Sequence, residues 1–477
     1  MAVSTTVETK PLEPDTPSEQ ASAQRSEAAR RFWFGVASAV ALGAAVRFTY
    51  LFHGGPSWVK GDGFGYHLLA LRVADGLGYT VAFGSDVGAE NAHHPPGWTT
   101  VLASVAEAGG RSMRAHQVTG LVIGLGVILL AGLVGRRYVG LRVGVLAALL
   151  AAIYPGFWVL EAQILSEPLG LLVLGVLMLV LADLWQRPTL AGAVVAGVLS
   201  GALALVRSEQ LALLVIAVVP LVLLNPRLGL RRRFAWTGAA TAVALLMIAP
   251  WTIHNLGRFE EPVLLSTNGG NLLLLGNCPS TYGGELMGFY DTGCLFALGG
   301  AARGLDRSQV DVEARKAAFE NMGDNLDRLP ATVLARYGRL TATFRTTPTV
   351  EHVASWFGTA TWPVWAWVSS FWLIAPLAVY GSVLLRRSRT FQWPLVAPVV
   401  VVVLVVTVSY GEPRYHTPAD LGIVVLAAVA LDHVQRRVRR ATSGDTDAPT
   451  DRRQALGGHS HAGTSGTLRT RTSTGPA

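Results

Sequence analysis

A small set of charged side chains in this sequence could perform acid–base chemistry on an anionic substrate. Asp62 lies between two glycines, and the pair His93 and His94 follows later in the chain. A carboxylate can serve as a general base, and histidines can shuttle protons or bind phosphate. Arginine suits a phosphate, because its planar guanidinium donates paired, charge-assisted hydrogen bonds. The arginines that we consider for this role are Arg414, Arg207, Arg258 and Arg47.

These residues also have plain structural interpretations. Asp62 between glycines is typical of a turn. Arg414 and Arg207 each have an acidic neighbour two residues away, Glu412 and Glu209, so a local salt bridge is an alternative to phosphate binding for both. The sequence alone leaves these alternatives open.

Three further polar positions have a structural alternative as well. Ser166-Glu167-Pro168 fits a helix start, with Ser166 as the cap and Glu167 near the positive end of the helix dipole. The histidine pair is also consistent with ordinary surface residues in a loop. Arg47 lies near the outer end of the first apolar stretch, where snorkelling toward the interface is the simplest expectation.

The elements that must position these side chains are membrane-spanning helices. The chain has 477 residues, is 51% hydrophobic and 15% charged, and has a mean hydropathy of +0.40, which excludes an ordinary soluble protein. A bilayer core of roughly 30 Å requires about 20 apolar residues per helix. We therefore expect an all-α multispanning protein with about ten spans, near residues 32–51, 114–135, 139–155, 167–185, 190–206, 209–225, 234–254, 362–385, 393–410 and 417–436.

The arginine clusters predict the orientation of these spans. Short loops rich in Arg and Lys stay in the cytoplasm, and the clusters fall on one side if the spans alternate, which places both termini in the cytoplasm. The arginines that orient the spans then account for most of the net charge of +8, so we expect no nucleic-acid partner. The clusters are Arg30 and Arg31, Arg136, Arg137 and Arg142, Arg187, Arg227 to Arg233, Arg386 to Arg389, and Arg436 to Arg440.

Two large loops, 52–113 and 255–361, are then extracytoplasmic and contain most of the chemically interesting residues. Together they should form a cap of amphipathic helices and loops beside the bilayer. Cys278 and Cys294 both lie in the second loop and should form a disulfide in an oxidising compartment. Trp356 belongs to a tryptophan cluster typical of an interfacial belt, with sugar stacking as the alternative.

The domain organisation follows from composition. We expect a disordered cytoplasmic tail at 1–31, a membrane domain at 32–436, and a second disordered cytoplasmic tail at 437–477, since both tails lack the apolar residues needed for a core. Lysine is scarce while Ala, Val, Gly and Arg dominate, which favours the plasma membrane of a GC-rich bacterium.

Several motifs together resemble the GT-C class of membrane glycosyltransferases, particularly the branch related to protein O-mannosyltransferases and lipid A aminoarabinose transferases. They are Gly61-Asp62 after the first span, Tyr66, Gly76-Leu77-Gly78-Tyr79, Pro95-Pro96, Leu165-Ser166-Glu167-Pro168 and Glu412-Pro413-Arg414-Tyr415. The resemblance covers roughly residues 32–436.

The resemblance implies transfer of a hexosyl or pentosyl group from a polyprenyl-phosphate donor to a glycan, lipid or protein acceptor on the outer face of the membrane. Asp62 matches the family's general base, which implies an inverting displacement, and Tyr66, Glu167 and Glu412 would support the site. Many relatives in the mannosyltransferase branch carry an Asp-Glu pair at this position. This chain has Asp62-Gly63, which suggests another acceptor or a more distant subgroup.

Other functions and cofactors remain as alternatives. No compact spacing resembles a zinc motif, so the sequence predicts no metal ligands, while a divalent cation stays open because its use varies across the class. A transporter or flippase for a lipid-linked glycan would show charged residues inside its spans and internal repeats, and neither is evident. An O-antigen-type polymerase would share the hydropathy pattern but gives no reason for the pattern around Asp62.

Overall fold

The computed structural model of the chain describes residues 17–56, 58–84, 86–300 and 304–442. All regular structure in these residues is helical, apart from one isolated bridge between Thr80 and Glu90. The chain divides into a unit that ends at Asp432 and a C-terminal unit from His433. The expected all-α fold is therefore confirmed for the described residues.

The first half of the chain supplies helices that lie mostly in the predicted spans and in the first loop. Their bounds are α1 Pro17–His53, α2 Gly61–Ala74, α3 Pro96–Glu107, α4 Met113–Tyr138, α5 Leu141–Ile153, α6 Pro155–Glu161, α7 Glu167–Gln186, α8 Leu190–Val206, α9 Val219–Leu223 and α10 Leu230–Leu256, with short helices η1 Ser208–Leu211 and η2 Leu214–Val218.

The second half begins with the helices of the large second loop and ends with three long apolar helices. The bounds are α11 Gly269–Gly276, η3 Pro279–Tyr282, η4 Gly284–Leu286, α12 Gly293–Ala297, η5 Leu298–Gly300, α13 Arg307–Asp324, α14 Leu329–Leu340, α15 Thr346–Phe357, α16 Thr361–Arg387, α17 Trp393–Val408, η6 Pro413–His416 and α18 Thr417–Thr442.

Six helices of the described residues are long and apolar enough to cross a membrane, or seven if the bent pair α5 and α6 forms one span. The apolar helices Leu190–Val206, Ser208–Leu223 and Trp393–Val408 are shorter. The expected count of ten is therefore not confirmed. Hydropathy windows detect apolar stretches but not the polar or bent positions, such as Arg207 and Ser409, at which the helices stop.

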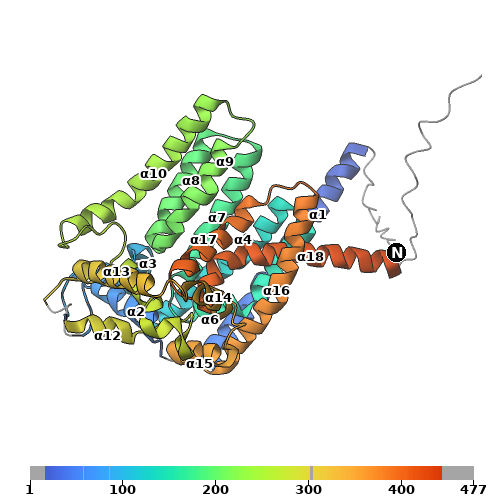
Figure 1. Cartoon of the computed structure of the whole chain (residues 1–477). Helices are drawn as coiled ribbons and strands as arrows, with labels where there is room; N and C mark the ends of the chain where they lie inside the picture. Colours follow the sequence, from blue (N-terminus) through green and yellow to red (C-terminus); the bar gives the residue numbers. More distant parts are fainter. Residues whose placement is uncertain (1–16, 57, 85, 301–303, 443–477) are drawn as a thin grey trace, which may run out of the picture. The chain divides into compact units, whose positions relative to one another are not determined.

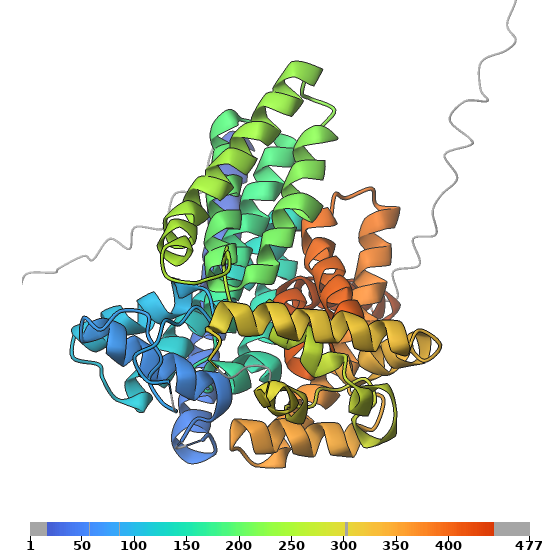
Figure 2. The same cartoon turned by 60° about the vertical axis from the view of Figure 1, so that its left-hand side comes forward.

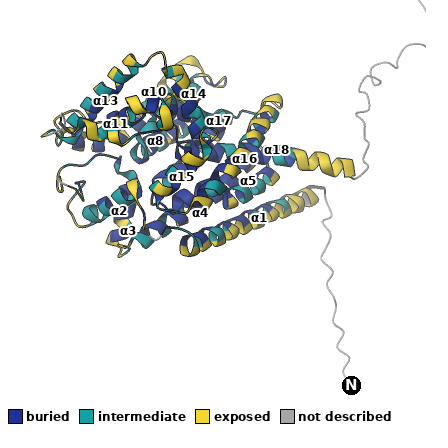
Figure 3. Cartoon of the chain, turned by 60° about the horizontal axis from the view of Figure 1, so that its bottom comes forward, coloured by how far each residue is buried: buried dark blue, intermediate teal, exposed yellow. Residues whose placement is uncertain are grey.

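Close packing between the spans depends on small residues. α8 packs along α10, and α4 packs against α5 and α7; Figures 1 and 2 show α7, α8 and α10 side by side. A Cβ on Gly197 of α8 would lie 2.3 Å from the carbonyl oxygen of Ala240 on α10, so only glycine permits this approach. The surface colouring of Figure 3 shows α1 exposed along much of its length.

A break between α5 and α6 returns Glu161 to the interior. Tyr154 is extended and Pro155 begins α6, which bends the pair by 49°. Arg47 of α1, with 0% exposure, donates to both oxygens of Glu161, at 2.6 and 3.0 Å, and to the Ala152 carbonyl at 2.9 Å. The snorkelling expected for Arg47 is wrong, because the re-entrant α6 supplies a buried counter-charge.

The cap is built from both outer loops. α2 packs on α3, α11 packs on α13, and α14 contacts α17. Cys278 and Cys294 form a disulfide that joins the start of η3 to α12. Asp306 caps α13 with a capping box. Its carboxylate accepts from the Gln309 N–H, which satisfies an otherwise free amide.

Parts of both predicted tails are helical. α1 already begins at Pro17, so residues 17–31 do not fit the disordered tail expected at 1–31; the stretch is rich in Ala, Glu, Gln and Arg, which favour helix. α18 likewise continues to Thr442, past the boundary expected at 436. The remaining tail residues, 1–16 and 443–477, lie outside the described residues.

Candidate active site

A cavity of about 440 Å³ collects side chains from the first loop, the second loop and the ends of several spans. Asp62, His93 and His94 come from the first loop, while Arg207 and Arg414 come from the ends of helices. Other lining residues are apolar, among them Val401, Val402 and Val405 of α17 and Leu272 and Leu275 of the second loop. A polar wall and an apolar wall therefore face one space.

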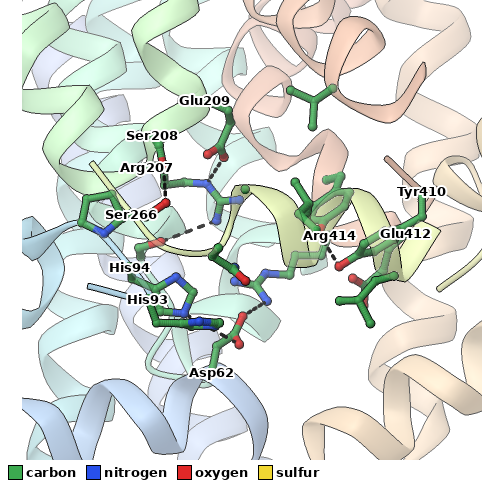
Figure 4. A pocket seen from close by; sticks show the side chains of 18 of the residues that line it. Asp62, His93, His94, Arg207, Ser208, Glu209, Ser266, Tyr410, Glu412 and Arg414 are labelled. Carbon is green, nitrogen blue, oxygen red and sulfur yellow. Dashed lines mark hydrogen bonds and ion pairs between the residues drawn. The ribbon is translucent and has the colours of Figure 1, made fainter. Parts of the chain in front are cut away.

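Arg414 is the centre of the polar wall. Its Nη1 donates to Asp62 Oδ2 at 2.7 Å, and its Nε donates to Glu167 Oε1. Arg207 reaches the same Glu167 oxygen with Nη1 at 2.8 Å and Glu209 Oε1 with Nε at 2.5 Å. The five side chains thus form one alternating row of charges, part of which is seen in Figure 4.

Two of the expected local interactions have different outcomes. The pair of Arg207 with Glu209 is present, but Arg414 pairs with Asp62 and Glu167, and no ion pair with Glu412 occurs in the described residues. Ser166 makes no side-chain cap for α7. Glu167, 2% exposed, is therefore explained by its two arginines better than by helix capping alone.

Asp62 is held on the first turn of α2, where the helix dipole favours a negative charge. Burial acts to raise the pKa of the carboxyl, but Arg414 and His94 together outweigh it and hold that pKa well below its usual range. The Nε2 of His94 lies 3.8 Å from Asp62 Oδ1. The carboxylate is consequently ionised and oriented before any substrate binds.

The glycine after Asp62 is required by the packing of α2. A Cβ on Gly63 would lie 2.0 Å from the backbone oxygen of Gln163 and 2.5 Å from Val59 Cγ1. No side chain fits such a space. This gives a physical reason for the departure from the Asp-Glu pair: the second carboxylate has no room at position 63.

The remaining predicted residues of the first loop lie close to Asp62. The rings of Tyr66 and His94 stack with centroids 4.6 Å apart, and those of His93 and His94 meet edge to face at 4.6 Å. Burial lowers the pKa of His93 to about 3, so its ring is neutral at physiological pH. Burial also raises the pKa of Tyr66, which keeps its hydroxyl protonated.

Arg258 does not belong with the other arginines. It pairs with Glu90 and approaches His254 Nε2 at 2.9 Å, and it is not among the residues that line the cavity. The structure therefore does not bring Arg258 together with Asp62, Arg207 and Arg414. The reason is that the Arg258 side chain, which follows α10, forms an ion pair with Glu90 of the first loop.

Several cavity residues were not singled out from the sequence. Tyr290 of the second loop packs against Tyr410 at 4.8 Å and accepts or donates a hydrogen bond with His352 at 2.9 Å. Trp356, interpreted as part of an interfacial belt, lines the cavity.

The Asp62, His93 and His94 group has three potential metal-ligand atoms within 4.8 Å of one another. Both Asp62 oxygens, however, already face a partner, Arg414 at 2.7 Å and His94 at 3.8 Å. The Arg414 guanidinium beside Oδ2 would repel a divalent cation at this group. The residues present fit a metal poorly, and no step below depends on one.

A family model described as dolichyl-phosphate-mannose-protein mannosyltransferase matches residues 93–254. The matched segment includes His93, Glu167 and Arg207, but neither Asp62 nor Arg414. No curated protein matches the chain. The resemblance to membrane glycosyltransferases expected from the sequence is confirmed over residues 93–254 by this family match.

Solved structures of two membrane transferases are similar to this chain. The archaeal oligosaccharyltransferase AglB from Archaeoglobus fulgidus, in complex with an inhibitory peptide and a dolichol-phosphate, is 15% identical over 88% of this chain with a TM-score of 0.47. The chain spans about half of that protein, 52%. ArnT from Cupriavidus metallidurans, bound to undecaprenyl phosphate, is 16% identical over 87% of this chain and 81% of its own, with a TM-score of 0.40.

Proposed function

We propose that the protein transfers a sugar from a polyprenyl-phosphate donor to a hydroxyl acceptor. One observation carries the proposal: Asp62 and Arg414 meet at 2.7 Å in a cavity that also has an apolar wall from α17. A carboxylate for a hydroxyl, an arginine for a phosphate and an apolar surface for a lipid are the three elements that this reaction needs.

Arg414 and Arg207 are the residues proposed to hold the donor phosphate. Both are positioned by the buried Glu167, so their guanidinium groups are fixed before the donor arrives. Fixed positive groups stabilise the charge that develops on a leaving phosphate without reorganising during the reaction. His93 and His94, on the opposite side of Asp62, would contact the sugar or the phosphate.

Asp62 is the carboxylate proposed to face the acceptor hydroxyl. As the acceptor oxygen bonds to the anomeric carbon, the bond from that carbon to the phosphate oxygen breaks, and the hydroxyl proton moves toward Asp62. A single displacement of this kind inverts the anomeric configuration. When the donor phosphate takes over the Arg414 guanidinium, the Asp62 carboxylate is freed for the hydroxyl. General-base assistance contributes about 10²- to 10⁴-fold.

The setting of the reaction is part of the proposal. Residues 32–436 would form the catalytic membrane domain, with both termini in the cytoplasm and the cavity on the extracytoplasmic side of a bacterial plasma membrane. The positive-inside distribution of arginine supports this orientation. The acceptor is a cell-envelope glycan, a glycolipid or a protein, and the sugar is a hexose or a pentose.

The test is a donor panel with purified protein in proteoliposomes. Each polyprenyl-phosphate sugar, radiolabelled in the sugar, is incubated with membrane extracts as acceptor source, and the label is followed from the lipid into product. We expect one donor to lose its sugar to an acceptor and leave free polyprenyl phosphate. Movement of an intact lipid-linked sugar across the bilayer, with no cleavage of any donor, would instead establish the transporter alternative.

A further inference from the structure

The cavity has four carboxylates near its polar wall, and one of them differs from the others. Asp62, Glu167 and Glu209 are each engaged by at least one arginine. The Glu412 side chain lines the same cavity at 4% exposure, and within the described residues its carboxylate has no hydrogen bond or ion pair. It is the carboxylate of this group that remains available to receive a proton.

The backbone holds Glu412 firmly at the cavity wall. Gly411 donates its N–H to the Gly288 carbonyl at 3.0 Å, and a Cβ at this glycine would lie 1.8 Å from the carbonyl oxygen of Arg336. Pro413 follows and restricts the next φ angle. An extended residue fixed on both sides by close contacts has little freedom to turn its side chain into solvent.

Charged and titratable groups surround Glu412 on every side. Burial raises the pKa of its carboxyl to about 7, and the negative charges of Asp62 and Glu167 act in the same direction against the opposing effect of the arginines. The groups that face it are Arg414 of η6, Asp62 of α2, Glu167 of α7, Arg207 after α8, Tyr290 of the second loop, and Tyr410 and Tyr415 beside it.

The two carboxylates therefore have complementary properties. Asp62, beside Arg414 and His94, has a pKa far below neutrality and holds a captured proton poorly. Glu412 can be ionised and then protonated near neutral pH. Efficient proton acceptors have a pKa near the working pH. A carboxylate that orients the hydroxyl and a second one that keeps the proton would divide the task between them.

We propose that Glu412 takes up the proton that the acceptor hydroxyl loses, while Asp62 orients that hydroxyl and makes the first contact with its proton. The inference rests on the proposed sugar transfer. The hydroxyl O–H bond breaks as the new glycosidic bond forms. The bond between the anomeric carbon and the phosphate oxygen breaks at the same time, and its electron pair leaves with polyprenyl phosphate. The proton passes by way of Asp62 to Glu412. No further reactant is needed.

The experiment is the pH dependence of kcat/KM for sugar transfer by the full-length protein between pH 5 and 9, with the donor identified by the panel. Because Glu412 must be ionised to accept a proton, the wild-type rate should fall as the pH decreases through about 7. In Glu412→Gln this acid limb should disappear, and kcat/KM at pH 8 should fall about 100-fold or more. In Glu412→Ala, which leaves space where the carboxylate was, added formate should restore part of the lost turnover.

Matched variants separate this role from a structural one. Glu412→Asp keeps a carboxylate and should keep the acid limb. His94→Gln removes the histidine that contacts Asp62, and it too should keep the limb. Asp62→Asn should lower the rate at every pH and move the limb to lower pH, because a negative neighbour of Glu412 is lost.

The outcomes distinguish the two proposals. Glu412 is not the proton acceptor, and sugar transfer stands, if the wild type transfers sugar but Glu412→Gln, folded with the thermal stability of the wild type, keeps the acid limb. The same conclusion follows if Glu412→Ala is not rescued by formate. If the limb disappears in His94→Gln instead, the proton goes to the histidine. If the wild type transfers no sugar from any donor, the proposed function fails first.

Discussion

Replacing Gly63 by alanine is predicted to disable the site through a single methyl group. The added Cβ would lie 2.0 Å from the Gln163 backbone oxygen, whereas such contacts are essentially never shorter than 3.0 Å. The start of α2 must therefore move by roughly 1 Å, the difference between these two distances. Overpacking of this kind costs about 1 to 3 kcal/mol of stability.

The same displacement should affect catalysis more than stability. Asp62 precedes Gly63 on α2, so a shift of this size would break its 2.7 Å contact with Arg414. A misplacement of about 1 Å can cost on the order of 100-fold in rate. We therefore expect kcat/KM of Gly63→Ala to fall roughly 100-fold, with a lowered midpoint of thermal unfolding in detergent.

Gly65→Ala is the matched control, since it makes the same change two residues later on the same helix. A Cβ there meets nothing within 4 Å, so this variant should keep wild-type transfer and be as stable or slightly more stable, because alanine favours helix over glycine by about 1 kcal/mol. Wild-type transfer and stability in Gly63→Ala, or equal losses in both variants, would refute this reasoning.

Three more predictions follow from the geometry. Arg414→Ala should lose nearly all transfer, whereas Arg258→Ala should stay within about threefold of the wild-type kcat/KM, because Arg414 lines the cavity and Arg258 does not. Equal losses in the two variants would contradict the placement of Arg258. Glu161→Gln should destabilise the fold by about 3 to 5 kcal/mol, since it leaves the buried Arg47 without its counter-charge; an unchanged unfolding midpoint would argue against a structural pair. Incubation with EDTA should leave transfer unchanged, because Arg414 and His94 face the Asp62 oxygens; a loss that Mg²⁺ or Mn²⁺ reverses would show that a cation replaces them.

The membrane topology predicted that the site residues lie on one face of the membrane. It did not predict which of them form ion pairs. Asp62, His93 and Arg414 were expected on one face of the membrane because the arginine clusters mark the other face, and the cavity does contain them. The pair of Arg414 with Asp62 joins residues 352 positions apart. The only partner for Arg414 that the sequence offered was its neighbour Glu412, because only local neighbours are visible without contacts.

The buried position of Arg47 and the unconfirmed number of spans share a physical cause. Hydropathy shows where a chain is apolar but not where a helix bends, and the bend at Tyr154 and Pro155 both shortens one span and returns Glu161 to Arg47. Gly63 is a related case. Its role became apparent only when the Gln163 carbonyl was found against it, and the resemblance to relatives with an acidic residue there gave no reason for the difference.

The most direct measurement of the central claim is sugar transfer by Asp62→Asn, compared with wild type and Asp75→Asn at equal amounts of folded protein. Asp75 is a half-exposed carboxylate at the C-terminal end of α2, paired with Arg111 and outside the cavity lining. The account predicts wild-type turnover for Asp75→Asn and a loss of at least about 100-fold for Asp62→Asn. Equal turnover in all three proteins would contradict the assignment of the reaction to this cavity.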